Sequence, residues 1–375
     1  MRQQIPETMS AIVLTGHGGY EKLELHHDWP TPKPEKGEVL IKVAACGMNN
    51  TDINTRIGWY DDNVEGDTTS GGEDGFDVVT DDSIGGWGNT GIQFPRIQGA
   101  DPVGRVVAVG EGVSEEWLEA RVITDNWLRD WDEPMNRNKS GYFGSEMDGG
   151  FAQYVKVPVT NVGRIESDWS DAELATLSCA YTTAENMLTR ARVAADDIVF
   201  VTGASGGVGS ALIQLSKRRG ATVIALTHEA KADQVKAIGP DAIIRRGVDD
   251  WKAVIREVSG GEKVTVTADV VGGPVFHQLM EILDRGGRYV TAGAIGGKKV
   301  EIDISHLYLF DWELIGSTVN TLDIFPNLIR YVENNEIRPL LAKTYPLSEI
   351  HQAQADFLDK KHVGKLVVIP PQSCY

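Results

Sequence analysis

The sequence predicts an α/β protein of two domains, a β-barrel-like domain and a doubly wound parallel sheet. Three observations predict this fold. The chain has 375 residues, which is more than a single domain usually holds. From Met9 to about Val162, short β-type runs alternate with Gly, Pro and Asp. From Asp171 onward, strands instead alternate with helices, as in a parallel sheet.

The first domain is predicted from short runs of alternating apolar residues, namely SAIVLTGHGG, GEVLIKVAACG, GRVVAVGEGV and GGFAQYVKVP. Frequent turns between short strands favour a barrel over a βαβ arrangement. The tail holds a helix in FPNLIRYVENN and a strand in KLVVIP, and we expect it to return to this domain. We therefore assign residues 1–170 and 320–375 to one domain, and residues 171–319 to the other.

Residues 60–91 fit neither pattern, because they are rich in Gly and acidic residues and have little apolar periodicity. Their acids do not match the twelve-residue calcium loop, which needs a central Gly and a final Glu. We interpret the segment as a surface insertion. A metal site, a partner patch and an active-site lid are the alternatives.

The second domain begins with the strand DIVFVTG, a Gly-rich turn and the helix SALIQLSKRRG. Further strands are expected in TVIALT, AIIRR, VTADVV, RYVTAG and WELIGSTV, with helices in KADQVKAIG, DDWKAVIREVSGG and PVFHQLMEILDRGG between them.

The Gly-rich turn is the strongest chemical signal. A strand precedes it, a helix follows it and a second strand arrives about 20 residues later, which is the context of a dinucleotide site. Its glycines allow a tight turn and a close backbone approach, and the helix start faces the pyrophosphate. The residues expected to contact the cofactor here are Gly203, Ser205, Gly206, Gly207, Val208 and Gly209.

The end of the second strand favours NADP(H) over NAD(H). NAD sites usually carry an acid there, whereas this strand ends at Thr227 and His228. Glu229 follows and could still bind a ribose. Lys231 and Arg246, with Arg245 beside it, are the cations that a 2′-phosphate would need.

Composition excludes several function classes. A formal charge of −18 argues against a nucleic-acid partner, which needs a basic surface. The three cysteines are too few for a disulfide scaffold. The N-terminus lacks a secretory apolar run, and no apolar stretch is long enough to span a membrane. We expect a cytoplasmic protein that acts on a small molecule.

The sequence resembles the medium-chain dehydrogenase/reductase superfamily over nearly its whole length. The motifs that carry the resemblance are, in order, CGMNNTD, QGADPVGRVVAVGEGV, GGFAQYVKVP, LSCAYTTAENML, VTGASGGVGS, RGGRYVTAG and GKLVVIP. The resemblance implies a GroES-like substrate domain, a Rossmann domain, an active site in the cleft and a homodimer or homotetramer. The phosphate turn is most similar to the quinone-oxidoreductase and enoyl-reductase branches.

The sequence departs from the zinc-dependent branch of this superfamily. Asn49 stands where the first zinc cysteine belongs, and Ala100 replaces the histidine. Asp101 replaces the next glutamate, and Cys179 alone matches a ligand position. A catalytic zinc needs about three protein ligands, so no zinc and no other metal is expected. The alternative is a metal site rebuilt from Cys46, Asp101 and Cys179.

The resemblance also implies further site residues. Asn49 would contact the nicotinamide ribose or the substrate, and Asp52 would orient it. Thr182 and Thr183 match the segment that packs by the nicotinamide. Gly293 and Lys360 fall at cofactor-binding positions, with Lys360 near the 2′-phosphate. The second proton could come from Tyr60, from Tyr181 or from solvent.

These features predict an oxidoreductase that transfers hydride from NADPH to an activated alkene or quinone. Without a Lewis acid, conjugate reduction is easier than carbonyl reduction, because the charge spreads over an enolate that hydrogen bonds can stabilise. An enoyl-CoA is one such acceptor. The alternatives are an alcohol or polyol dehydrogenase with a rebuilt zinc site and a non-catalytic NADPH-binding protein.

Overall fold

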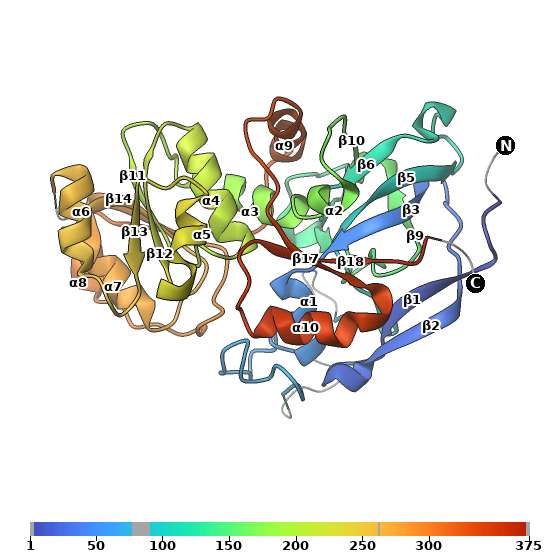
Figure 1. Ribbon diagram of the computed structural model, residues 1–375, viewed down its shortest axis with the longest axis horizontal. Helices are drawn as coiled ribbons and strands as arrows, with labels where there is room; N and C mark the ends of the chain where they lie inside the picture. Colours follow the sequence, from blue (N-terminus) through green and yellow to red (C-terminus); the bar gives the residue numbers. More distant parts are fainter. Residues whose placement is uncertain (1–3, 77–90, 262, 373–375) are drawn as a thin grey trace.

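The computed structural model describes residues 4–76, 91–261 and 263–372. Two halves lie side by side along the long axis of the molecule, one built on antiparallel strands and one on a parallel sheet (Figure 1). Helix α3 (Ser178–Arg190) lies where the two halves meet. Among the described residues there is no helix with the length and apolar character needed to cross a membrane.

The antiparallel half is organised around β3 (Glu38–Gly47), whose core-facing residues are fully buried. Its main sheet has the order β10-β6-β5-β3-β18-β17, and β9 also pairs with β3. The tail contributes β17 and β18, and β18 runs antiparallel to β3. The other elements of this half are β1 (Thr8–Leu14), β2 (Leu23–Pro30), β4 (Arg96–Ile97), β5 (Asp101–Val109), β6 (Arg121–Thr124), β7 (Trp127–Leu128), β8 (Gly141–Tyr142), β9 (Tyr154–Pro158), β10 (Val162–Arg164), β17 (Leu341–Pro346), β18 (Lys365–Ile369), α1 (Asn50–Ile57), α2 (Asp171–Leu174), α9 (Ile324–Glu333) and α10 (Ile350–Leu358).

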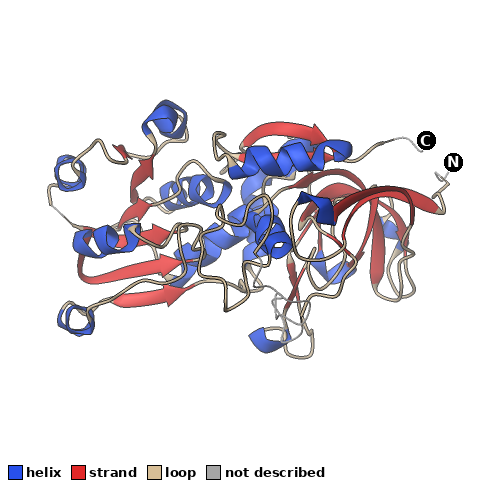
Figure 2. Cartoon of the chain, turned by 90° about the horizontal axis from the view of Figure 1, so that it is seen from below, coloured by secondary structure: helices blue, strands red, loops and turns tan. Residues whose placement is uncertain are grey.

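The other half confirms the predicted doubly wound sheet. Its six parallel strands have the order β13-β12-β11-β14-β15-β16, which is the Rossmann order, and helices lie on both of its faces (Figure 2). The strands are β11 (Ile198–Val201), β12 (Thr222–Thr227), β13 (Ala242–Arg245), β14 (Val264–Asp269), β15 (Leu283–Thr291) and β16 (Glu313–Gly316). The helices are α4 (Gly207–Arg218), α5 (Ala232–Lys236), α6 (Trp251–Ser259), α7 (Val275–Ile282) and α8 (Ile304–Leu309).

One boundary differs from the sequence prediction. The helix expected over PVFHQLMEILDRGG ends at Ile282, and β15 begins at the next residue. Gly286 has a φ of 70°, a left-handed conformation that an α-helix cannot contain. Leu283 instead pairs with Val264 of the neighbouring strand.

Strand register brings four distant segments together. Gly47 at the end of β3 pairs with Asp101 at the start of β5 and with Val367 in β18. A Cβ at Gly47 would lie 2.0 Å from the carbonyl oxygen of Ala175, so only glycine lets the segment before α3 approach. The chain just after β3, the start of β5, the start of β18 and the start of α3 therefore meet at one place.

Candidate active site

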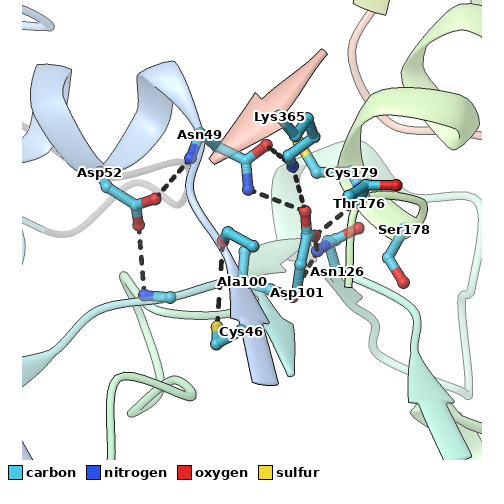
Figure 3. Close-up of polar contacts among 12 residues, drawn as sticks. Cys46, Asn49, Asp52, Ala100, Asp101, Asn126, Thr176, Ser178, Cys179 and Lys365 are labelled. Atoms are coloured by element: carbon cyan, nitrogen blue, oxygen red, sulfur yellow. Dashed lines mark hydrogen bonds and ion pairs between the residues drawn. The ribbon is translucent and has the colours of Figure 1, made fainter. Parts of the chain in front are cut away.

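The side chain of Asp101 lies at this meeting point, and it has no solvent exposure (Figure 3). Its Oδ1 accepts hydrogen bonds from Asn126 Nδ2 and from the backbone N–H of Cys179, each at 2.9 Å. Its Oδ2 accepts from Asn49 Nδ2 at 3.0 Å and from Lys365 Nζ at 2.5 Å. A buried carboxylate needs full hydrogen bonding and an opposite charge, and this cluster supplies both.

Lys365 provides the positive charge of the cluster, and its side chain is 5% exposed. Its ammonium also donates to Asn49 Oδ1 at 2.6 Å. Burial by itself would lower the pKa of Lys365, but the adjacent Asp101 carboxylate outweighs it and the pKa is raised. Sequence reasoning missed this residue, although a lysine that opens the apolar strand KLVVIP is a signal in itself, because lysine is almost never buried unless paired.

These residues do not fit the zinc ion that the zinc-dependent branch would hold. Asn49 and Ala100 bring no thiolate or imidazole, and both Asp101 oxygens are occupied by N–H donors. The Lys365 ammonium lies against the same carboxylate and would repel a divalent cation. Over the described ranges, no group of three or more His, Cys, Asp or Glu side chains is placed to hold a metal.

Asp52 holds Asn49 in place. Its Oδ2 accepts from the Asn49 backbone N–H at 2.8 Å, and its Oδ1 accepts from the Gly99 N–H at 3.2 Å. Asn49 is the N-cap of α1, so this pair also fixes the start of the helix. Burial raises the pKa of Asp52 to about 7, against the opposing effect of the Asn49 hydrogen bond. The geometry assigns Asp52 an orienting role.

The two tyrosines that the sequence suggested as proton donors lie in different surroundings. The Tyr181 hydroxyl donates to the Arg338 carbonyl at 2.6 Å and accepts from Gln214 Nε2 at 2.8 Å. Both contacts fix it away from the Asp101 cluster, which argues against the expectation that Tyr181 is a proton donor. Tyr60 is partly buried, and burial raises the pKa of its phenol, with Cys179 as one of the neighbouring groups that raise it further.

Tyr142 is a phenol that sequence reasoning missed. Its hydroxyl donates to Cys179 Sγ at 3.0 Å, and its ring packs edge-on against Trp127. The short ribbon of β7 and β8 brings these aromatic residues to the cluster. No local motif marks this residue, because its contact with Cys179 spans 37 positions of the chain.

The phosphate turn has the backbone that a dinucleotide site requires. Gly203 has a φ of 56°, and a Cβ at Gly209 would lie 2.1 Å from the Gly203 carbonyl oxygen. Gly206 is the N-cap of α4, and the first N–H groups of that helix have no partner within the helix. A Cβ at Gly206 would meet only one atom, at 3.4 Å, so this side of the turn is open. The turn therefore fits a pyrophosphate.

Thr227 adds an independent sign of a ligand. It ends β12, and its Oγ1 is buried without a hydrogen-bond partner among the described residues. A buried hydroxyl without a partner costs free energy unless a ligand satisfies it. This is the strand end at which a dinucleotide places its adenosine ribose.

Three cations gather at the same strand end without a carboxylate partner among the described residues. Lys231 Nζ lies 3.3 Å from Ser205 Oγ and donates to the Lys360 carbonyl. Burial, and then repulsion by Arg246, lowers the pKa of Lys231. Lys360 donates to Asn50 Oδ1 at 3.0 Å. Such unneutralised charge favours an anionic ligand.

Arg245 differs from its neighbour Arg246. It forms ion pairs with Asp249 at 2.6 Å and with Glu229 at 3.3 Å. The expectation that Arg245 adds positive charge at the ribose edge is therefore not supported, and Glu229 is directed to Arg245.

The other predicted cofactor residues lie on α3 and just after β15. Thr182 Oγ1 donates to the Ser178 carbonyl at 2.7 Å, which leaves its oxygen free to accept from a ligand. Thr183 follows it on α3 and is partly exposed. Gly293 comes just after β15, and a Cβ there would lie 3.0 Å from the Val270 carbonyl oxygen.

Residues 59–72, most of which belong to the described part of the predicted insertion (60–76 and 91), form a strap between the two halves. Lys298, in the loop after β15, donates to the Asp61 carbonyl at 2.9 Å and lies 4.4 Å from the centre of the Trp59 ring. The Thr68 N–H donates to the Ile295 carbonyl at 3.3 Å. Residues 77–90, which the sequence prediction included in the insertion, lie outside the described residues.

We expect Lys298→Ala to speed release of the nicotinamide cofactor by about 30-fold, because the strap then loses a charged hydrogen bond and a cation–π contact worth about 2 kcal/mol together. Stopped-flow fluorescence of the bound cofactor measures this rate. Lys299→Ala is the comparison: its ion pair with Glu65 also reaches the strap, but both groups are about three-quarters exposed, so its loss is expected to change the release rate little. Equal release rates in the two variants would rule out the strap contact.

Two family models match the chain. The model of the alcohol dehydrogenase GroES-like domain matches residues 35–167, and the model described as zinc-binding dehydrogenase matches residues 207–334. A Sinorhizobium meliloti protein provisionally assigned as an alcohol dehydrogenase is 45% identical, with 98% of each chain covered and a TM-score of 0.88.

Two further relatives carry more specific names. The acryloyl-coenzyme A reductase of Metallosphaera sedula is 28% identical over 96% of this chain and 99% of its own length. A thermostable alcohol dehydrogenase of Pyrobaculum aerophilum, solved with cobalt and zinc bound, is 28% identical over 96% of this chain and 99% of that chain, with a TM-score of 0.79. Both are similar to this chain over almost its whole length.

Proposed function

We propose that this chain, which belongs to the medium-chain dehydrogenase/reductase superfamily, reduces the activated double bond of an enoyl thioester with NADPH. Membership of that superfamily makes the chain a nicotinamide-dependent oxidoreductase. The observation that carries the proposal is the Asp101 cluster. The Lys365 ammonium lies in this cluster, at the place where the zinc-dependent branch has its metal ligands. Similarity to the acryloyl-coenzyme A reductase of Metallosphaera sedula supports the substrate class.

The chemistry suits such a cluster. A reduced nicotinamide supplies the hydride. The acceptor gains that hydride at its β-carbon and a proton at its α-carbon, and its carbonyl oxygen carries negative charge in between. Hydrogen-bond donors held in fixed positions stabilise that charge. We place the acceptor between the two domains, with Asn49 and Tyr142 beside it. One domain consists of residues 1–170 and 320–375, and the other of residues 171–319.

NADPH is the proposed cofactor because of the charges around the adenosine end. The turn from Gly203 to Gly209 would hold the pyrophosphate. Lys231, Arg246 and Lys360 would surround a 2′-phosphate, with Ser205 as a further donor. NADH lacks the 2′-phosphate, so a site for NADH would not need three cations without carboxylate partners at this position.

NADPH affinity is expected to fall by about tenfold as pH rises from 6.5 to 9, a change of about 1.4 kcal/mol. Burial, and then the charge of Lys231, lowers the pKa of Lys360 to about 7. Below this pKa the ammonium attracts the phosphate, and above it the neutral amine does not, so the affinity is lost as pH rises. Fluorescence titration of NADPH at several pH values measures it. Lys360→Met is the reference variant, because its NADPH affinity still depends on the titration of the 2′-phosphate itself. If the pH dependence of this variant equals that of the wild-type protein, Lys360 is not the titrating group.

We also propose that the chain forms a homodimer or homotetramer. Large apolar side chains are exposed along α8 and the edge strand β16, including Ile304 at 62%, Tyr308 at 65% and Leu314 at 43%. Such a patch on a soluble protein favours a protein partner, and an exposed sheet edge favours a second copy. Light scattering is expected to give two or four times the 40.9 kDa chain mass, and Tyr308→Asp with Leu314→Lys is expected to give monomers.

The experiment for the reaction is an NADPH-oxidation assay with acryloyl-CoA and crotonyl-CoA, compared with quinones and simple ketones. We expect kcat/KM to be at least about 100-fold higher for an enoyl-CoA than for a ketone, because only the conjugated acceptor spreads its charge. Alcohol oxidation is the second candidate, favoured by the names of the Sinorhizobium meliloti and Pyrobaculum aerophilum proteins. Turnover of secondary alcohols alone would select it over the proposal.

A further inference from the structure

We infer that Lys365 is a catalytic residue. Its ammonium supplies a permanent positive charge and donates a hydrogen bond to the carbonyl oxygen of the acceptor. The inference rests on the proposed function, since it needs an acceptor whose carbonyl oxygen gains negative charge. Asp101 and Asn49 are then positioning residues that act through Lys365.

The position of Lys365 links the two parts of the site. It opens β18, and its stem packs against the phosphate turn, where a Cβ at Gly207 would lie 2.9 Å from Lys365 Cγ. The Gly364 N–H donates to the Ser205 carbonyl at 2.9 Å, which ties the start of β18 to the same turn. The ammonium therefore lies beside both the expected cofactor and the Asp101 cluster.

The hydrogen bonds of the ammonium leave one donor for a ligand. Lysine has three N–H donors, and those of Lys365 contact two oxygens, Asp101 Oδ2 and Asn49 Oδ1. No other described residue accepts a hydrogen bond from Nζ. A buried ammonium with an unused donor is costly by itself, and a carbonyl oxygen would satisfy it.

The rest of the cluster fixes the ammonium in place. Asn126 and the Cys179 N–H hold the Asp101 carboxylate from its other side, so the carboxylate cannot turn away from Lys365. In the resting site the two charges balance. When negative charge develops on the acceptor oxygen, a cation already in position can stabilise it without reorganisation.

The test compares two variants in the same Asp101→Asn background, one that keeps the Lys365 ammonium and one that removes it. Asp101→Asn keeps the ammonium and removes the anion. The double variant Asp101→Asn with Lys365→Met removes both charges and keeps the volume. We expect the double variant to lose on the order of 100- to 1,000-fold in single-turnover hydride transfer relative to Asp101→Asn, as when one oxyanion donor is removed. Its NADPH dissociation constant is expected to stay close to that of the single variant, and its Tm to be no lower, because the single variant leaves the Lys365 ammonium without a counter-charge.

Two further measurements make the result specific. In Asp101→Asn with Lys365→Ala, added methylammonium or ethylammonium is expected to restore at least about tenfold of the lost rate, because the small cation fills the vacated position. Lys139→Met with Glu133→Gln is the matched control, an exposed ion pair at 2.7 Å, and it is expected to leave the rate unchanged. Equal hydride-transfer rates in Asp101→Asn and the Lys365→Met double variant would overturn the inference, and so would one tightly bound zinc per wild-type chain.

The assay separates this inference from the proposed function. It uses the carbonyl acceptor that the wild-type protein reduces fastest, whichever class that is. If enoyl thioesters are inert and another conjugated carbonyl is reduced, the substrate class is wrong while the comparison of variants still tests Lys365.

Discussion

Replacing Lys231 and Arg246 together by methionine is expected to raise the dissociation constant for NADPH about 100-fold and to leave that for NADH within about threefold. Lys231 lies 3.3 Å from Ser205 in the phosphate turn, and Arg246 is close enough to lower its pKa. Hydrogen bonds to a charged phosphate contribute about 1.5–3 kcal/mol each, and about 3 kcal/mol in total corresponds to about 100-fold. NADH lacks the 2′-phosphate and loses none of these contacts.

Arg245→Met is the matched control for this prediction. Arg245 is next to Arg246 in the chain, but its guanidinium is taken up by Asp249 and Glu229. We expect its removal to change NADPH affinity by less than about threefold. Fluorescence titration with both cofactors measures the two variants and the wild-type protein. If NADH affinity falls as far as NADPH affinity, the two cations hold the shared part of the cofactor and the 2′-phosphate assignment is wrong.

The sequence predicts those features that depend on local pattern. Gly203 and Gly209 predict the phosphate turn because each meets a backbone requirement within a few residues, namely the positive φ of Gly203 and the close approach of Gly209 to the Gly203 carbonyl oxygen. The alternation of strands and helices predicts the doubly wound parallel sheet, since strands joined by helical crossovers run parallel. Asn49 and Asp52 are instead expected from the family resemblance, and in the structure they cap α1 through a contact three residues apart.

The sequence does not predict features that depend on contacts across the fold. Lys365 reaches Asp101 across 264 positions and Asn49 across 316, and only the sheet register brings them together. Tyr181 looks equivalent to Tyr142 in sequence, yet its place on α3 directs its hydroxyl to Arg338. The sequence does not show which of Arg245 and Arg246 is available to bind a phosphate, because the two differ in the acidic side chains that each one contacts.

Replacing Arg56 by methionine is expected to lower the free energy of unfolding by about 3–5 kcal/mol, the largest loss that we expect from a change outside the Asp101 cluster. Arg56 has no solvent exposure, although burial lowers its pKa only to about 10, so it stays charged at neutral pH. Its guanidinium donates to the Gly18 carbonyl at 2.9 Å, the Gly72 carbonyl at 2.6 Å and Gln354 Oε1 at 2.8 Å. Methionine has a similar volume, so the loss reports the three acceptors left without a donor.

Those three acceptors explain why the effect should reach the active site. Gly72 ends the strap and Gln354 belongs to α10, so Arg56 joins the strap to the antiparallel half as Lys298 joins it to the parallel half. We expect Arg56→Met to speed cofactor release as Lys298→Ala does, and the two changes together to add little, because either one frees the strap. Urea unfolding measures the stability, with Gln354→Leu as a comparison that removes one acceptor and is expected to cost about 1 kcal/mol. A loss below about 1.5 kcal/mol for Arg56→Met would mean that water replaces the guanidinium, and the strap would then have no fixed anchor on this side.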